Sequence, residues 1–298
     1  MTGEAIIVLQ ARLASRRLPG KALALIDGRP ILARCLDRLQ ASGAASVVLA
    51  TTTNREDDTL AAVAIGQGVP VVRGPDADAL RRFLMVAERF GAAYIIRATA
   101  DNPAVDIDAP RRVLQTLVGT DVDYVTESGL PYGAAVEAVT VDALHRAEAM
   151  AVDASDREHV TSLVRRNRLF QAIEVAAPRA VHRPDLRLTV DTLHDLAYMR
   201  RVLSVFDRDT IEPPLAAIVA AADTLMLRSE AVPDDYRDPP GRFPTAAQRG
   251  SDRGDRDDAG HARVADDGRH RARARGSSGT GEQDYPIQGR RGTVGSRS

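Results

Sequence analysis

A short basic segment follows the first apolar run of the chain. Residues 5–9 are apolar throughout, and four cations fall within residues 12–21, at Arg12, Arg16, Arg17 and Lys21. Arg12, Arg17 and Lys21 together could neutralise a triphosphate, because side-chain cations bind phosphate oxygens. The segment lacks the glycines of a P-loop and of a G-x-G-x-x-G turn, which argues against a P-loop hydrolase and a dinucleotide-binding protein. The alternative is a solvated basic loop without a ligand.

Two aspartates stand where they could bind a metal ion. Asp101 lies on a turn after the apolar run 93–96 and before Pro103, and Asp191 follows the run 186–190. Two carboxylates at the ends of two strands can share one Mg²⁺, a hard cation that prefers oxygen ligands. The structural alternatives are a turn residue at Asp101 and a helix N-cap at Asp191.

The elements that must position these residues alternate between strand and helix. Continuous apolar runs indicate strands buried on both faces, and apolar residues at helical spacing indicate the helices between them. This order predicts the α/β class, as a three-layer, Rossmann-like fold with a mostly parallel sheet and helices on both faces. Ligands of such sheets bind beyond the carboxyl ends of the strands. The expected strands are 5–9, 46–50, 69–72, 93–96, 136–140, 170–175 and 186–190, and the expected helices are 30–43, 57–65, 78–90, 141–150, 156–166 and 193–206.

Length and composition limit the class of protein. The 298 residues carry 40 basic and 41 acidic side chains, so net charge gives no argument for a specific nucleic-acid partner or a membrane. No apolar run approaches the roughly 20 residues that cross a membrane, and no secretory signal is visible, so we expect a cytoplasmic protein. Cys35 is the only cysteine, which excludes an intrachain disulfide.

The composition changes after about residue 240. Residues 241–298 hold 11 of the 22 glycines and few large apolar side chains. Such a segment buries too little apolar surface to offset the entropy of ordering it. We therefore expect a folded domain over residues 1–235 and a disordered tail, rich in Arg, Gly and Asp, over residues 241–298. Weak contact of the arginines of the tail with RNA or DNA is a less favoured alternative.

Several motifs in fixed order resemble those of the cytidylyltransferases. That family includes the enzymes that activate sialic acids and 3-deoxy-manno-octulosonate, and the closest resemblance is to the branch of spore-coat polysaccharide biosynthesis protein F. The resemblance covers roughly residues 4–206. The motifs that carry it are 10–12 with 15 and 17–21, then 50–58, 73–74, 97–103, 157–161 and 186–192.

The resemblance implies a nucleotidyltransferase fold of the GT-A-like type, with a small inserted region for dimerisation and acceptor binding. It implies Mg²⁺-dependent transfer of CMP from CTP to an acidic sugar or a related small anionic acceptor, with release of pyrophosphate, by a homodimer. The residues matched to catalysis are Arg12, Lys21, Asp101 and Asp191, of which the two aspartates match the metal ligands. The residues matched to CTP are Gln10, Ala11, Arg12, Ser15, Arg17, Lys21, Thr52, Arg73 and Arg97, and those matched to the acceptor are Tyr132, Glu137 and His159.

The chain departs from the family pattern where the acceptor is expected to bind. The usual stretch reads Pro-Arg-Gly, any residue, Asp-Val-Glu; here Tyr132 replaces the Arg and Ala135 the Asp, while Glu137 is kept. Ala14 also replaces a usual Gly of the basic segment. A phosphonate acceptor, a nucleotide-sugar glycosyltransferase with an acidic pair at 121–123, and a non-catalytic nucleotide-binding relative are therefore the alternatives.

One count supports a ligand for the basic segment. Of the 40 basic residues, 39 are Arg, and the single Lys is Lys21. A GC-rich coding sequence accounts for the general preference for Arg but not for the place of the remaining Lys. Arg and Lys are not interchangeable where a compact point charge must reach a phosphate. A triphosphate contact would explain this lysine.

Overall fold

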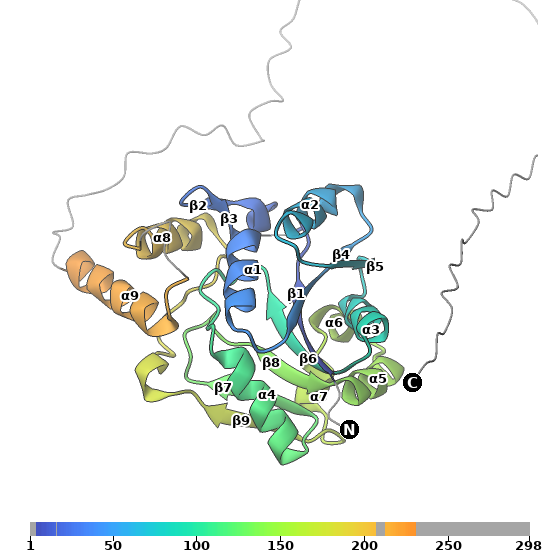
Figure 1. Cartoon of the computed structure of the whole chain (residues 1–298). Coiled ribbons are helices and arrows are strands. Elements are labelled where there is room, and N and C mark those ends of the chain that lie inside the picture. Colours follow the sequence, from blue (N-terminus) through green and yellow to red (C-terminus); the bar gives the residue numbers. More distant parts are fainter. Residues whose placement is uncertain (1–3, 16, 207–211, 231–298) are drawn as a thin grey trace, which may run out of the picture. The chain divides into compact units, whose positions relative to one another are not determined.

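A seven-stranded sheet forms the centre of the fold in the computed structural model, which describes residues 4–15, 17–206 and 212–230 (Figure 1). The strand order is β5-β4-β1-β6-β8-β7-β9. Strand β8 alone runs antiparallel to its neighbours β6 and β7, whereas the other pairs are parallel. The strands are β1 (Glu4–Gln10), β4 (Ser46–Thr52), β5 (Val71–Gly74), β6 (Ala92–Thr99), β7 (Tyr124–Ser128), β8 (Glu137–Thr140) and β9 (Ala172–Ala176), and β2 (Leu25–Ile26) with β3 (Arg29–Pro30) forms a separate hairpin.

Helices cover both faces of the sheet, and each face has its own apolar core. Ile7 and Leu9 of β1 pack in one core, while Ile6 and Val8 pack in the other, because successive side chains of a strand point to opposite faces. Figure 1 shows α1 and α4 on the near side of the sheet. The first core takes α1 (Ile31–Ala41), α2 (Asp58–Gly66), α4 (Ala109–Thr120), α8 (Leu193–Leu203) and α9 (Leu215–Glu230); the second takes α3 (Ala79–Phe90), α5 (Val141–Met150) and α7 (Ser162–Arg166), and α6 (Ala154–His159) packs against α3.

Local signals explain where several helices begin and end. Helix α3 begins after Asp78, whose carboxylate accepts from the Arg81 backbone N–H at 2.8 Å, and ends at Gly91 with a φ of 64°. Helix α8 begins with a capping box between Thr192 and Asp195. The N-cap, which was the structural alternative considered for Asp191, is therefore formed by Thr192, and this leaves the carboxylate of Asp191 for other partners.

The predicted α/β class, with a mostly parallel sheet and helices on both faces, is confirmed. The predicted strand 186–190 is wrong. This segment does not join the sheet; Leu188 N–H donates to the Tyr132 carbonyl at 2.8 Å, and Val190 N–H donates to the Asp101 carbonyl at 2.8 Å. Its apolar side chains are buried, but its backbone pairs with two loops. The segment therefore ties these two loops together at one edge of the sheet.

The single helix predicted over 156–166 is also wrong. It is broken into α6 and α7 at Val160, which has a φ of 57° and a ψ of −63°. Strand β7 and helix α4 were not among the expected elements. The expected tail over 241–298 lies outside the described residues.

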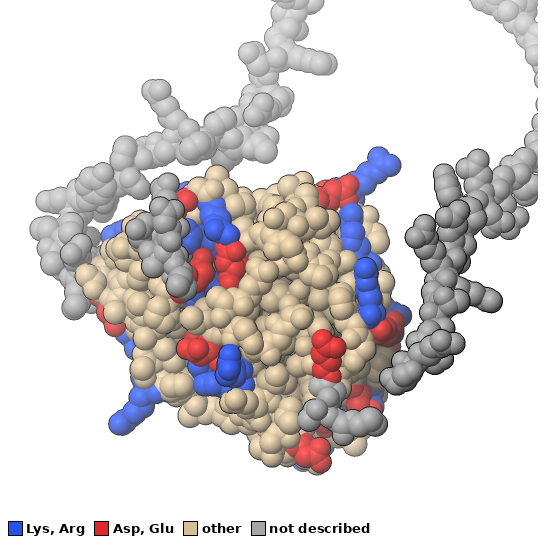
Figure 2. All heavy atoms as spheres, in the orientation of Figure 1, with Lys and Arg blue, Asp and Glu red and all other residues tan. Residues whose placement is uncertain are grey.

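On the face drawn in Figure 2, uncharged residues cover most of the surface, and basic side chains lie in small groups with acidic ones next to them. Within the described ranges, no helix combines the length and the apolar character that a membrane crossing requires.

Candidate active site

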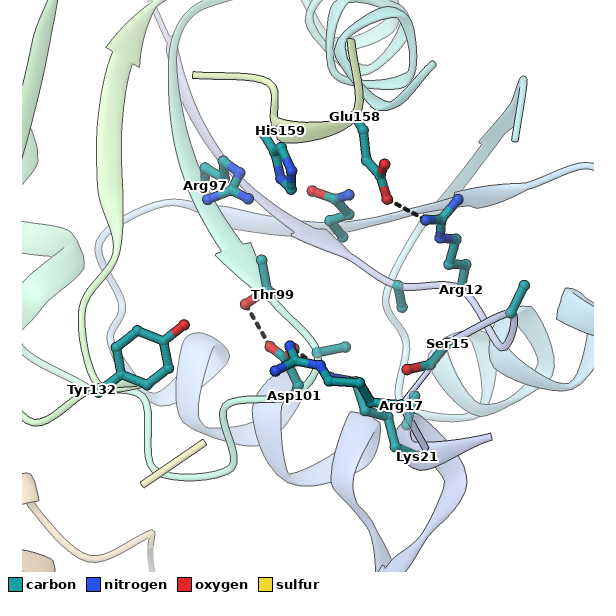
Figure 3. Close-up of a pocket in the computed structure, with 15 residues that line it drawn as sticks. Arg12, Ser15, Arg17, Lys21, Arg97, Thr99, Asp101, Tyr132, Glu158 and His159 are labelled. Carbon is teal, nitrogen blue, oxygen red and sulfur yellow. Dashed lines mark hydrogen bonds and ion pairs between the residues drawn. The ribbon is translucent and has the colours of Figure 1, made fainter. Parts of the chain in front are cut away.

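A pocket of about 540 Å³ opens beyond the carboxyl ends of β1 and β6 (Figure 3). Its floor comes from the sheet face that packs against α3, where Gln10 of β1 is in register with Thr99 of β6. The segment after β1 forms one side, and the end of α6 forms another. The residues that line it are Gln10, Ala11, Arg12, Ala14, Ser15, Arg17, Lys21, Ala22, Arg97, Thr99, Ala100, Asp101, Tyr132, Glu158 and His159.

The basic segment folds back on itself, and this brings Lys21 to the edge of the sheet. Gly20 N–H donates to the Leu13 carbonyl at 3.1 Å, and Gly20 has a φ of 72°, a conformation that glycine adopts without strain. Leu13 N–H in turn donates to the buried carboxylate of Asp57 at 2.8 Å. The loop is therefore held at both ends, and Lys21 begins a short 3₁₀ helix over Lys21–Leu23.

Lys21 lies between the two aspartates. Its Nζ is 2.7 Å from Asp101 Oδ2 and 2.8 Å from Asp191 Oδ1. Asp191 also pairs with Arg17 at 2.8 Å and with Arg187 at 2.7 Å. Burial alone would raise the pKa of Asp191, but the hydrogen bond and charge of Lys21, with Arg187 and Arg17, hold that pKa below its usual value. Both carboxylates therefore contact the same ammonium nitrogen, Lys21 Nζ.

Arg97, which lines the pocket, forms a partly buried ion pair with Glu137. The two residues are register partners across β6 and β8, and Arg97 Nη1 is 3.0 Å from Glu137 Oε2. The same oxygen accepts from Thr161 Oγ1 at 2.7 Å. Burial would raise the pKa of Glu137, but Arg97, Thr161 and Arg165 hold it below its usual value, so this carboxylate stays ionised. Figure 3 shows Arg97 and His159 on the side of the pocket away from Arg17 and Lys21.

A strained turn presents α6 to the pocket. Thr161 N–H donates to the His159 carbonyl at 2.6 Å around Val160, whose dihedral angles are those of a classic γ-turn. Such a conformation is costly for a β-branched residue and persists only where its surroundings fix it. Val160 is fully buried. The turn places Glu158 and His159 at the pocket and directs Thr161 to Glu137.

Most residues predicted from the sequence to form the site lie at this pocket. Gln10, Ala11, Arg12, Ser15, Arg17, Lys21, Arg97, Asp101, Tyr132 and His159 line it. Asp191 and Glu137 do not line the pocket but pair with residues that do: Asp191 with Lys21 and Arg17, and Glu137 with Arg97. Tyr132 is 61% exposed, and its ring lies under the guanidinium of Arg187, with 4.9 Å from Cζ to the ring centroid.

Thr52 and Arg73, which were matched to CTP, do not line the pocket. Thr52 is fully buried and donates to Asp57, the carboxylate that also anchors the basic segment. Arg73 donates to the backbone carbonyls of Thr52 at 2.7 Å and Asn54 at 2.8 Å. In this structure the two side chains hold the loop after β4.

Glu158 and Arg187 were not among the predicted site residues. Glu158 pairs with Arg12, which also lies 3.3 Å from Asp76. Arg187 bridges Asp191 and Asp195, at 2.7 Å and 3.0 Å, and thereby fixes Oδ2 of Asp191, the oxygen that does not contact Lys21. The excess of cations near Asp191 is visible only once residues 17, 21 and 187 are brought together by the fold.

The fold and the site together define a class of protein. A mostly parallel α/β sheet carries, at the carboxyl edge where such sheets bind ligands, a loop with three cations. Two carboxylates from separate segments face this loop. This arrangement suits a nucleoside triphosphate and a divalent ion, and it is that of a nucleotidyltransferase.

Comparison with known proteins identifies the family. The model of the cytidylyltransferase family matches residues 5–219, so the chain belongs to this family and is an enzyme that transfers CMP from CTP. The uncharacterized protein MJ1063 of Methanocaldococcus jannaschii is 33% identical over 202 residues, which are 67% of this chain and 83% of that protein. The spore coat polysaccharide biosynthesis protein SpsF of Bacillus subtilis is 32% identical over 197 residues, 64% of this chain and 82% of that protein.

The solved structures agree with this assignment. A cytidylyltransferase from Leptospira borgpetersenii superposes with a TM-score of 0.70 at 25% identity, covering 76% of this chain and 96% of that chain. The resemblance that the sequence motifs indicated, to the cytidylyltransferases and their spore-coat branch, is thereby confirmed.

Proposed function

We propose that this cytidylyltransferase transfers CMP to a small anionic acceptor, such as an acidic sugar, and that a magnesium ion at Asp101 and Asp191 assists the transfer. The observation that carries the proposal is that Asp101 and Asp191 share one cation. The Nζ atom of Lys21 lies 2.7 Å from an oxygen of Asp101 and 2.8 Å from an oxygen of Asp191. A hard divalent ion suits such oxygen ligands.

The donor set at this point fits magnesium. Within the described part of the chain, no group of three or more His, Cys, Asp or Glu side chains surrounds one position. Magnesium commonly takes one or two carboxylates and completes its shell with water and substrate phosphates, so Asp101 and Asp191 suffice. When bound there, the ion would neutralise charge on the α-phosphate and lower the barrier to attack on phosphorus.

The remaining catalysis falls to the side chains of the basic segment. Arg12, Arg17 and Lys21 line the pocket, and in this proposal they bind the triphosphate and stabilise the pyrophosphate as negative charge develops on it. Charge neutralisation and positioning account for most of the catalysis in such transfers. Arg12 now pairs with Asp76 and Glu158, so its guanidinium is already oriented at the pocket.

Arg97 supports an anionic acceptor. It was matched to CTP, but it lies within β6, whereas Asp101 lies in the turn that follows this strand. Its Nε atom is buried and has no partner in the described protein, while Glu137 occupies Nη1. We propose that a carboxylate or phosphonate of the acceptor pairs with this guanidinium, beside His159 and Tyr132.

The test is a substrate screen. The full chain is incubated with each of the four ribonucleoside triphosphates, Mg²⁺ and a panel of acidic sugars and phosphonates, and pyrophosphate is measured. The proposal expects release that needs CTP, the metal and an anionic acceptor together. Release with neutral sugars only, or equal release with all four triphosphates, would contradict it. The homodimer and the cytoplasmic location stay predictions.

A further inference from the structure

The ammonium of Lys21 stands where the proposed metal ion would bind. Its Nζ contacts one oxygen of Asp101 and one of Asp191 at 2.7 Å and 2.8 Å, and its side chain is 15% exposed. A magnesium ion would contact the same two oxygens at roughly 2.0–2.1 Å. The ammonium and the ion would then overlap in space and repel each other. Lys21 and a divalent ion are therefore alternative occupants of one position.

The charges around this position favour the lysine when the chain is alone. Lys21, Arg17 and Arg187 are all paired with Asp191, Lys21 also with Asp101, and Arg187 also with Asp195, so three cations balance three carboxylates. A dication that enters this cluster meets no net negative charge. Without Lys21 the cluster would carry one net negative charge, and the same ion would be attracted to it.

A triphosphate would reverse this balance. It brings about four negative charges to the basic segment, and an ammonium on a flexible stem can turn from carboxylate to phosphate oxygens. The pocket adjoins the lysine, so the side chain needs no change in the sheet to reach it.

This exchange also accounts for the residue type. The planar guanidinium of an arginine forms two parallel hydrogen bonds with a carboxylate and gives them up together, whereas an ammonium is a compact point charge. The chain uses Arg at 39 of its 40 basic positions and Lys only here. A residue that must leave two carboxylates for a phosphate is better served by lysine.

We propose that, in the protein without nucleotide, the ammonium of Lys21 occupies the position of the metal ion. Binding of CTP draws Lys21 to the phosphates and so leaves Asp101 and Asp191 free to bind the divalent ion. The proposal rests on the proposed function for the place of the metal. It predicts an order of binding in which the nucleotide precedes the metal or enters with it. Lys21 then has two roles in succession, as an occupant of the metal position and as a contact of the phosphates.

The test measures Mn²⁺ binding to the full chain without nucleotide, by the electron paramagnetic resonance signal of free Mn²⁺. We expect Lys21→Met to bind Mn²⁺ at least tenfold more tightly than the wild type. The matched control is Arg12→Met, which removes one cation from the same segment. Because Arg12 pairs with Asp76 and Glu158 and not with Asp101 or Asp191, this variant should bind Mn²⁺ as the wild type does. Asp191→Asn in the Lys21→Met background should abolish the gain.

Two further measurements keep the test decisive. Lys21→Arg retains a cation and should keep Mn²⁺ affinity low without nucleotide, which covers the case in which Lys21→Met fails to fold. In EDTA, isothermal titration should detect CTP binding to the wild type, since the nucleotide precedes the metal. Any of three results would overturn the proposal. These are equal Mn²⁺ affinity of the wild type and Lys21→Met, tight binding of Mn²⁺ by both the wild type and Lys21→Arg, and no binding of CTP in EDTA.

These results are independent of turnover. If the substrate screen gives no pyrophosphate but Lys21→Met still gains Mn²⁺ affinity through Asp191, the exchange at this position stands and the proposed acceptor chemistry fails. If pyrophosphate is released but the variants bind Mn²⁺ alike, the proposed function stands and the exchange fails.

Discussion

Replacement of Glu137 by Gln tests whether the Arg97 ion pair supports both the fold and the acceptor end of the pocket. The change keeps the shape of the side chain but removes the charge that faces Arg97 Nη1 at 3.0 Å and accepts from Thr161 at 2.7 Å. Removal of one partner from a buried pair typically costs about 3–5 kcal/mol. The Arg97 side chain is 18% exposed and borders the pocket, so water can partly replace the lost partner. We therefore expect a cost at or below the lower limit of this range, about 2–3 kcal/mol of unfolding free energy.

The effect should depend on pH with a defined sign. The pKa of Glu137 is held below its usual value in the folded protein, so its stabilisation is fully present above its ordinary unfolded value, about 4.3. It is lost as the pH falls through the lower folded pKa. The difference in unfolding free energy between wild type and Glu137→Gln should therefore be constant near neutrality and shrink below about pH 4.

The assay is equilibrium urea unfolding of the full chain, followed by circular dichroism at several pH values. Glu174→Gln is the matched control, because Glu174 is an exposed carboxylate on β9. It should change the unfolding free energy by less than about 0.5 kcal/mol. If Glu137→Gln costs no more than this control, or if its cost grows toward acid pH, the buried ion pair does not have the role argued for it.

Three other changes separate the parts of the site. Lys21→Ala should lower turnover at least a hundredfold, because loss of a donor to developing charge typically costs about 2.7–4 kcal/mol, and thermal unfolding should show that the fold survives; near-normal turnover would remove Lys21 from the reaction. Arg97→Gln should raise the KM for the acceptor about tenfold or more and change that for CTP much less, whereas the reverse result would return Arg97 to the nucleotide. Gly133→Ala should destabilise the fold by more than about 1 kcal/mol in urea unfolding, because Gly133 has a φ of 98° and the added Cβ would lie 2.8 Å from the Thr189 backbone nitrogen; an unchanged midpoint would show that the loop gives way.

The sequence predicted the first half of the sheet well because its signals are local and strong. The run 5–9 is apolar at every position, and only a strand buried on both faces needs that pattern. The segment 186–190 alternates apolar and polar residues as a strand does, yet its backbone N–H groups donate to the carbonyls of Tyr132 and Asp101. Periodicity reports which side chains are buried but not which backbone receives the hydrogen bonds, so this error could not be avoided from one sequence.

The site was predictable where charge and motif order agree. Arg12, Lys21 and Asp101 stand out by type and by place after a strand, and they do meet at the pocket. Arg73 and Thr52 stand at equally suitable strand ends, but their side chains hold the loop after β4. Whether a polar side chain at a strand end points to ligand or to backbone depends on the conformation of the next loop. The break at Val160 sets the direction of His159, but a β-branched residue gives no sequence signal for a turn with a positive φ.

The central place of β1 has a consequence for biosynthesis. Strand β1 is synthesised before both of its neighbours, since Ile6 pairs on one side with Ser46 of β4 and on the other with Ile95 of β6. One hydrogen-bonding edge of this strand, whose residues 5–9 are apolar, thus lacks its partner until β6 has been synthesised. Such edges recruit other strands, and parallel pairs between distant segments form slowly. The nascent chain is therefore most prone to aggregate in the interval between synthesis of β4 and of β6, when a chaperone would contribute most.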